Sequence, residues 1–221
     1  MATEEKEETD IAIFPTSYFP PIALMAAMVQ WLSRAESKGA LLLEQMETFA
    51  KQSHRNRTVI VTAAGRFTLS VPVERPNGNH TRTGDIAISY AERWNINHWR
   101  AIESAYNSSP YFLYYRDGIE SILMKRHRKL SDLNEELLMH LFKKMKIDAR
   151  ITHTEDYRQN YPSKIDYRGR YSYKRPEALP PYPAYQQVFS DRMPFQANVG
   201  ILDLLFNLGP ESRDYLMQIT T

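Results

Sequence analysis

The sequence has no cysteine, no long apolar run and no excess of one charge. Without cysteine there is no disulfide framework, thiolate zinc site or cysteine nucleophile, and a reducing compartment is expected. No segment approaches the roughly 20 apolar residues that a helix needs to cross a bilayer, so we expect no membrane insertion. The 28 Lys and Arg nearly balance the 26 Asp and Glu, for a net charge of +2. That balance argues against binding to polyanions through the overall field.

Familiar catalytic and metal motifs are also missing. The sequence contains no HExxH, CxxC or paired-carboxylate spacing, and neither a GxGxxG nor a Walker A loop. We therefore expect no metal, and the sequence names no cofactor. Residues 1–10 are acidic and lack the basic region and apolar core of a signal peptide. This favours a disordered leader and a cytoplasmic protein.

Periodicity predicts one α/β domain over residues 11–221, with a mixed β-sheet flanked by helices. The predicted strands are Ile11–Phe14, Ala40–Leu43 and a hairpin of Val59–Val61 with Phe67–Val73. The predicted helices are one opening at Pro20-Pro21, then Trp94–Ser108, Tyr111–Arg126, a helix through Leu133–Met145 with Asp132 and Glu135 as its capping box, and Ile201–Leu208.

The turn between the first strand and the first helix is a candidate ligand site. α/β folds place ligands at the carboxyl ends of strands, where a helix N-terminus favours an anion. The Ser17 hydroxyl could donate to an anion or cap the helix, and Tyr18 could offer its ring to a sugar or base.

A basic cluster at residues 51–57 is the strongest candidate for chemistry. Arg55 and Arg57 stand two residues apart, so on a strand they would point to one side and could clamp a carboxylate or phosphate. The neighbouring cations would keep His54 neutral and able to accept a proton. A solvated edge with local salt bridges is the other interpretation. The candidate substrate-binding residues here are Lys51, Gln52, Arg55, Asn56 and Arg57.

A second candidate group lies on the helix predicted at Trp94–Ser108. His98 is a core histidine or a second catalytic one, and Tyr106 and Asn107 near the helix end are candidate substrate-binding residues. Asp203 is a lone acid between leucines, for which we expect a capping or salt-bridging role.

Residues 157–185 break the pattern, with seven tyrosines, several prolines and few aliphatic side chains. A loop of this length in a compact domain is often a lid or binding loop. Aromatic rings among Arg and Lys suit stacked bases of a single strand, or one nucleotide or sugar under a lid. A polar, partly disordered loop is the alternative.

Several blocks in order resemble the WbqC-like family. They are Thr16-Ser17-Tyr18-Phe19-Pro20-Pro21, Lys51 to Arg57, Gly65 to Pro72, Trp94 to Tyr106, Tyr185-Gln186-Gln187-Val188-Phe189 and Leu202 to Glu211. The resemblance implies an enzyme acting on sugar or acyl intermediates in O-antigen-type surface polysaccharide assembly. One block departs from it: many relatives carry His-Gln-Pro where this chain has Phe14-Pro15-Thr16. The chain then uses another base or belongs to a divergent branch.

The sequence thus favours a bacterial transferase with a nucleotide-sugar or activated acyl donor. Its partner would be a small anionic substrate, seated between Arg55, Arg57 and the helix N-terminus after Ser17. The alternative is a non-enzymatic module that binds nucleic acid or a protein, with nucleic acid the less favoured partner. Nucleic-acid binding would weaken steeply with salt. The donor, the acceptor and the oligomeric state stay open.

Overall fold

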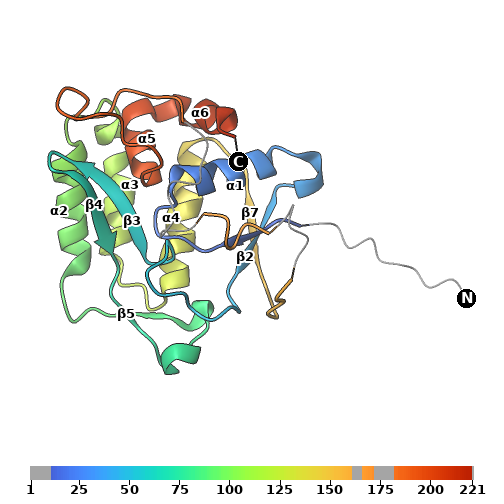
Figure 1. The fold of residues 1–221 in the computed structure, drawn as a ribbon. Helices are drawn as coiled ribbons and strands as arrows, with labels where there is room; N and C mark the ends of the chain where they lie inside the picture. The colour runs from blue at the N-terminus through green and yellow to red at the C-terminus, as the bar shows by residue number, and fades with distance from the viewer. Residues whose placement is uncertain (1–10, 161–165, 172–181, 221) are drawn as a thin grey trace, which may run out of the picture.

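The computed structural model describes residues 11–160, 166–171 and 182–220. A parallel sheet with the strand order β1-β2-β7 forms one part of the molecule (Figure 1). Its strands are β1 (Ile13–Pro15), β2 (Ala40–Glu44) and β7 (Arg150–His153). The register places Pro15 opposite Glu44, so the carboxyl ends of β1 and β2 meet at one edge. The predicted leader at 1–10 lies outside the described residues.

Two antiparallel pairs complete the strands. β3 (Arg57–Thr62) and β4 (Gly65–Ser70) form the predicted hairpin. β5 (Val73–Glu74) pairs instead with β6 (Ala87–Ile88). The sequence prediction had run the hairpin strand on to Val73. Pro72 ends it earlier, because proline has no N–H to donate to a ladder. The α/β class is correct, with parallel and antiparallel strands in separate sheets.

Six α-helices pack around these sheets in the described residues. They are α1 (Ile22–Leu32), α2 (Trp94–Tyr106), α3 (Phe112–Met124), α4 (Leu130–Lys144), α5 (Ile201–Leu208) and α6 (Ser212–Gln218). The predicted capping box is wrong: α4 begins at Leu130, two residues before Asp132, and its N-cap Lys129 makes no side-chain cap. The apolar stripe decides the start, since Leu130 is fully buried.

The N-terminus of α1 is closed by a segment far away in the sequence. The Ile22 N–H donates to the Val199 carbonyl at 3.0 Å, and the Ala23 N–H donates to Asn198 Oδ1 at 2.9 Å. These are two of the N–H groups that a helix start leaves without an intrahelical partner. The anion site predicted at this helix end is therefore occupied by the chain itself.

Part of the tyrosine-rich segment is fixed to the core. Asp166 forms a parallel bridge with Ile13, and the Tyr167 ring stacks on Phe14 with 4.5 Å between ring centroids. Although the segment has few aliphatic side chains, an aromatic one packs it against the core. Of the predicted loop at 157–185, residues 161–165 and 172–181 lie outside the described residues.

Candidate functional site

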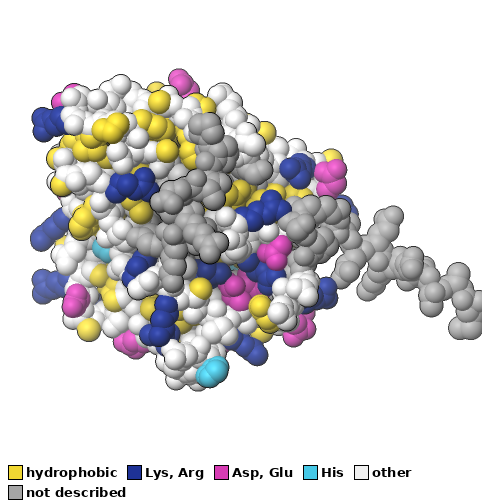
Figure 2. Space-filling view, viewed as in Figure 1, with side chains coloured by type: hydrophobic (Ala, Val, Ile, Leu, Met, Phe, Trp, Pro, Cys, Tyr) yellow, Lys and Arg dark blue, Asp and Glu magenta, His cyan; other side chains and the backbone are white. Residues whose placement is uncertain are grey.

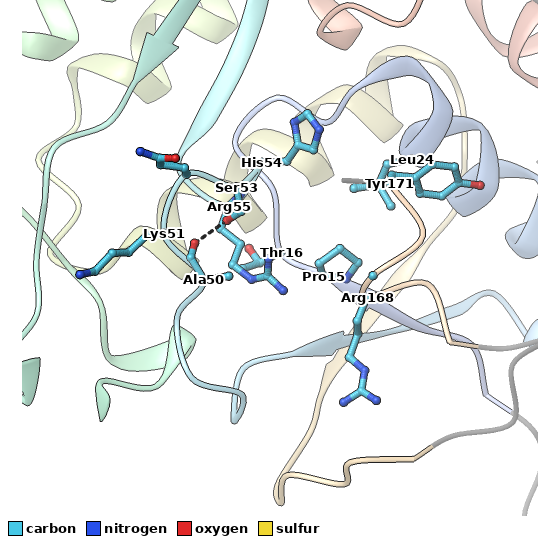
Figure 3. A pocket seen from close by; sticks show the side chains of 12 residues that line it. Pro15, Thr16, Leu24, Ala50, Lys51, Ser53, His54, Arg55, Arg168 and Tyr171 are labelled. Atoms are coloured by element: carbon cyan, nitrogen blue, oxygen red, sulfur yellow. Dashed lines mark hydrogen bonds between the residues drawn. The ribbon is translucent and has the colours of Figure 1, made fainter. Parts of the chain in front are cut away.

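A pocket of about 240 Å³ opens at the carboxyl ends of β1 and β2 (Figure 3). α/β folds characteristically bind ligands at this edge of a parallel sheet. The lining residues come from the end of β1, from α1, from the loop at 50–55 and from the turn at 168–171. They are Pro15, Thr16, Leu24, Ala50, Lys51, Gln52, Ser53, His54, Arg55, Arg168, Gly169 and Tyr171.

The loop at 50–55 forms the polar side of the pocket. Gln52 has a φ of +54°, and Ser53 Oγ donates to the Ala50 carbonyl at 2.7 Å, which closes a tight turn. The turn after β1 holds the loop from one side: the Tyr18 N–H and the Ser17 hydroxyl both donate to the His54 carbonyl, at 2.9 and 3.1 Å. The predicted roles of Ser17 as helix cap or anion donor are therefore not what the structure shows.

Arg55 does not lie on a strand. Arg55 and Arg57 therefore do not share one face of a strand, as the predicted clamp requires. β3 begins only at Arg57, which does not line the pocket. Arg55 is buried and binds Glu47 with two donors, Nε at 2.8 Å and Nη2. Burial raises the pKa of Glu47, and the Arg55 guanidinium opposes that rise. Nη1 of Arg55 makes no hydrogen bond with the described residues.

His54 is the one histidine among the described residues that line the pocket. Burial, followed by the charge of Arg55, lowers its pKa from 6.5 to about 4, against a smaller opposing effect of the Arg57 backbone. The imidazole is therefore neutral at physiological pH, as the neighbouring cations had indicated. A neutral imidazole is the form that can accept a proton.

Arg168 ties the pocket wall to the sheet. Its guanidinium donates to Glu44 Oε2 at 3.0 Å and to both carboxylate oxygens of Asp166. Further donations reach the carbonyls of Arg158 and Gln159, at 2.9 and 3.2 Å. All five guanidinium N–H donors have a described acceptor. Arg168 thus holds the turn at 168–171 against the sheet, and Glu44 and Asp166 balance its charge.

The opposite wall is apolar. Pro15, Leu24 and Tyr171 lie together there, across from the loop that carries Ser53 and Arg55 (Figure 3). Lys51 is exposed, and its side chain extends away from the other labelled groups. The pocket therefore joins one polar wall to one apolar wall. This arrangement suits a ligand with an anionic end and a ring or chain.

His98 and Tyr18 form a separate buried pair. Tyr18 Oη and His98 Nδ1 are 3.0 Å apart, and Trp94 lies edge-on to the histidine with 5.1 Å between centroids. Burial lowers the pKa of His98 to about 4, against a smaller effect of a hydrogen bond with the Ser70 backbone. Neither residue lines the pocket. Tyr18 is fully buried and does not present its ring to a ligand there.

Tyr106 and Asp203 belong to another buried network. Tyr106 accepts the Val61 N–H at 3.0 Å and donates to Asp203 Oδ2 at 3.1 Å. The other carboxylate oxygen accepts from Tyr185 at 2.6 Å and from Gln187 at 2.8 Å. Asp203 lies within α5 and makes no described salt bridge, so the predicted capping or ion-pair role is wrong. Three hydrogen-bond donors take the place of a cation.

The remaining predicted site residues, Asn56 and Asn107, support the local chain conformation. Asn56 donates from its side chain to the Val71 carbonyl at 2.9 Å, and Asn107 is the C-terminal cap of α2. The structure thus brings together Lys51, Gln52, His54 and Arg55, and it places Ser17, Tyr18, Asn56, Arg57, His98, Tyr106 and Asn107 outside the pocket lining.

Sequence reasoning missed the carboxylates beside the pocket. Glu44 and Glu47 follow the strand predicted at Ala40–Leu43, so their place at a strand's carboxyl end was the available signal. Thr16 was seen only as part of a turn. No sequence pattern indicated that Arg168 pairs with Glu44, because the two residues lie 124 positions apart.

Over residues 11–160, 166–171 and 182–220 no helix combines the length and apolarity needed to cross a membrane. In the same ranges no three His, Asp or Glu side chains gather as a metal site would require.

Comparison with known proteins identifies the family of the chain and a similar protein. A model of the WbqC-like protein family matches residues 18–168. The chain is also similar to the uncharacterized protein Rv1507c of Mycobacterium tuberculosis, with 28% identity over 196 residues, which cover 76% of this chain and 83% of that protein. No solved structure matches the chain.

Proposed function

Since this chain belongs to the WbqC-like protein family, we propose that it is a cytoplasmic transferase of bacterial surface-polysaccharide assembly. Its donor is a nucleotide-sugar or an activated acyl compound. The observation that carries the proposal is the pocket at the carboxyl ends of β1 and β2, with His54 and Arg55 on one wall and an apolar surface on the other.

Size and charge define which part of the donor enters. The pocket of about 240 Å³ is smaller than the roughly 300–1,000 Å³ typical of sites that enclose a whole drug-sized ligand. It would hold the reacting end, with the remainder outside. Arg55 Nη1 would bind the anionic group, while Glu47 neutralises part of the guanidinium charge. A single diphosphate or carboxylate suits this partly balanced site better than a polyanion.

The proposed chemistry is a displacement at the donor's reactive carbon. An acceptor hydroxyl oxygen forms the new bond to the anomeric or acyl carbon, and its proton passes to neutral His54. The bond to the diphosphate or thiolate breaks, and that leaving group departs with the electron pair. Arg55 would stabilise the charge that develops on a diphosphate leaving group.

A thermal-shift screen against UDP- and GDP-linked sugars and acyl-CoA compounds tests the proposal. One class should raise the melting temperature in a saturable way. The double variant Arg55→Gln with Glu47→Gln removes the guanidinium without leaving a buried carboxylate unpaired, and it should abolish that rise. Arg192→Gln, an exposed arginine beside Asp191, is the matched control and should bind normally.

His54→Gln separates binding from chemistry. With the donor found above, the variant should keep the thermal shift and lose at least a hundredfold in transfer rate, which is typical of removing a general base. Normal transfer by the variant would refute the role of His54. Binding of single-stranded nucleic acid that weakens steeply with salt would favour the non-enzymatic alternative. On the face drawn in Figure 2, however, Lys and Arg are scattered among Asp and Glu.

A further inference from the structure

Asn134 connects two walls of the pocket from a third element. It lies on α4 and is 1% exposed. Its side-chain nitrogen donates to the Arg55 carbonyl at 2.8 Å and to Thr16 Oγ1 at 3.2 Å. A carbonyl oxygen can only accept, so the amide nitrogen, and not its oxygen, must face Arg55. The same nitrogen therefore faces Thr16, and the direction of that hydrogen bond is fixed.

This geometry decides where the Thr16 hydroxyl hydrogen points. A threonine hydroxyl has one hydrogen and two lone pairs, and one lone pair here receives the Asn134 N–H. The hydrogen must therefore turn away from Asn134. No side chain or carbonyl in the described part of the chain accepts it. Thr16 lines the pocket and lies beside Arg55 in Figure 3.

We propose that the Thr16 hydroxyl donates a hydrogen bond to the anionic group of the ligand, and that Asn134 is the residue that positions it. The inference rests on the proposed function for the class of ligand. Together with Arg55 Nη1, the hydroxyl forms a two-donor site for one phosphate or carboxylate. Hydrogen bonds from a hydroxyl to an ionised oxygen are short and about twice as strong as neutral ones.

The adjacent serine provides a contrast within the same turn. Ser17 already donates its hydrogen to the His54 carbonyl at 3.1 Å, and it does not line the pocket. Two neighbouring hydroxyls thus have different assignments: Ser17 holds the loop and Thr16 binds the ligand. Removing one should change stability, and removing the other should change affinity.

Calorimetric titration with inorganic pyrophosphate tests the assignment. Thr16→Val keeps the shape of the side chain but removes the donor, and the Kd should rise about tenfold to a hundredfold, the usual worth of a hydrogen bond to a charged group. Thr16→Ser should stay within about twofold of the native protein. Ser17→Ala, the matched control, should bind normally with a lower urea midpoint. Should Thr16→Val fold poorly, Thr16→Ala removes the same donor.

Asn134 is tested through a double-mutant cycle. Asn134→Ala should weaken pyrophosphate binding in the native background and have no further effect in Thr16→Val, because both changes remove the same donor geometry. Additive losses would mean that Asn134 affects binding independently of the Thr16 hydroxyl, and would overturn its positioning role.

The outcomes separate the two proposals. If pyrophosphate binds the native protein and Thr16→Val equally well, the hydroxyl assignment is overturned and the transferase proposal stands. If the native protein binds neither pyrophosphate nor any of the UDP-linked sugars, GDP-linked sugars and acyl-CoA compounds of the screen, both are overturned. Equal weakening by Ser17→Ala and Thr16→Val would also count against a specific role for Thr16.

Discussion

Replacing Arg168 with methionine tests how strongly the pocket wall is fastened to the sheet. Arg168 fills the space between Glu44, which is fully buried, and Asp166, whose side chain is 22% exposed. Methionine keeps much of the side-chain volume and removes every donor. Asp166 can turn to water, but Glu44 cannot. The variant therefore leaves one buried carboxylate without its cation.

The cost follows from the burial of Glu44. Breaking a buried ion pair by removing one partner costs about 3–5 kcal/mol. For a chain of this size each kcal/mol lowers the melting temperature by about 2–4 °C, so we expect a fall of about 10 °C. With an m-value of about 2–3 kcal/mol/M, the urea midpoint should fall by about 1–2.5 M.

A second variant assigns the loss to the charge. Arg168→Met combined with Glu44→Gln removes both members of the pair, and the glutamine oxygen can still accept from the Thr154 hydroxyl and the Met46 N–H. The double variant should recover about 2 kcal/mol relative to the single one. Urea unfolding followed by tryptophan fluorescence measures both. A single variant that loses less than about 1 kcal/mol, or a double variant no more stable than the single, would refute the reasoning.

Three further predictions concern the rest of the molecule. Burial lowers the pKa of His54 and of His98 to about 4, so on acidification the unfolded chain takes up these protons before the folded protein does. The contribution of the two histidines to the free energy of unfolding is therefore complete above pH 6.5 and is lost as the pH falls toward 4, by on the order of 3 kcal/mol per histidine. A urea midpoint that stays flat over this range would contradict the prediction. Gly200→Ala should cost several kcal/mol, because its Cβ would lie 2.3 Å from Thr58 Oγ1 and 2.9 Å from the Val59 carbonyl, whereas Gly169→Ala meets nothing within 4 Å and should be nearly neutral in thermal unfolding. Asp203→Asn should cost about 1–3 kcal/mol, since an amide group toward Tyr106 leaves that hydroxyl without its acceptor; an unchanged melting temperature would show that the network rearranges.

The sequence predicted those helices and strands whose signal lies in consecutive residues. The helix at Ile201–Leu208 agrees with its prediction, because eight consecutive residues carry the signal. The hairpin was recognisable from its alternation and from Gly65, whose φ of +101° suits the turn. Of the basic cluster predicted at 51–57, residues 51–55 line the pocket, and their role in binding a substrate stays a prediction.

The pairing of those polar groups was not predictable from spacing. Arg55 pairs with Glu47 instead of acting beside Arg57, because the chain turns at Gln52 before β3 begins. The acceptors of the first helical N–H groups come from Asn198 and Val199, more than 170 residues on. No local pattern carries such information, and a single sequence leaves those partners open.

The parallel bridge between Ile13 and Asp166 has a consequence for how the protein is made. The first strand cannot complete its pairing until residue 166 has been synthesised, and α1 cannot be closed until residue 199 has followed. During translation β1 can pair with β2, but its other edge stays unpaired until residue 166 has followed. Contacts between such distant positions slow folding, since the long loop must close before they contribute. Refolding should accordingly be slow, and a chain cut before residue 198 should not reach the native state.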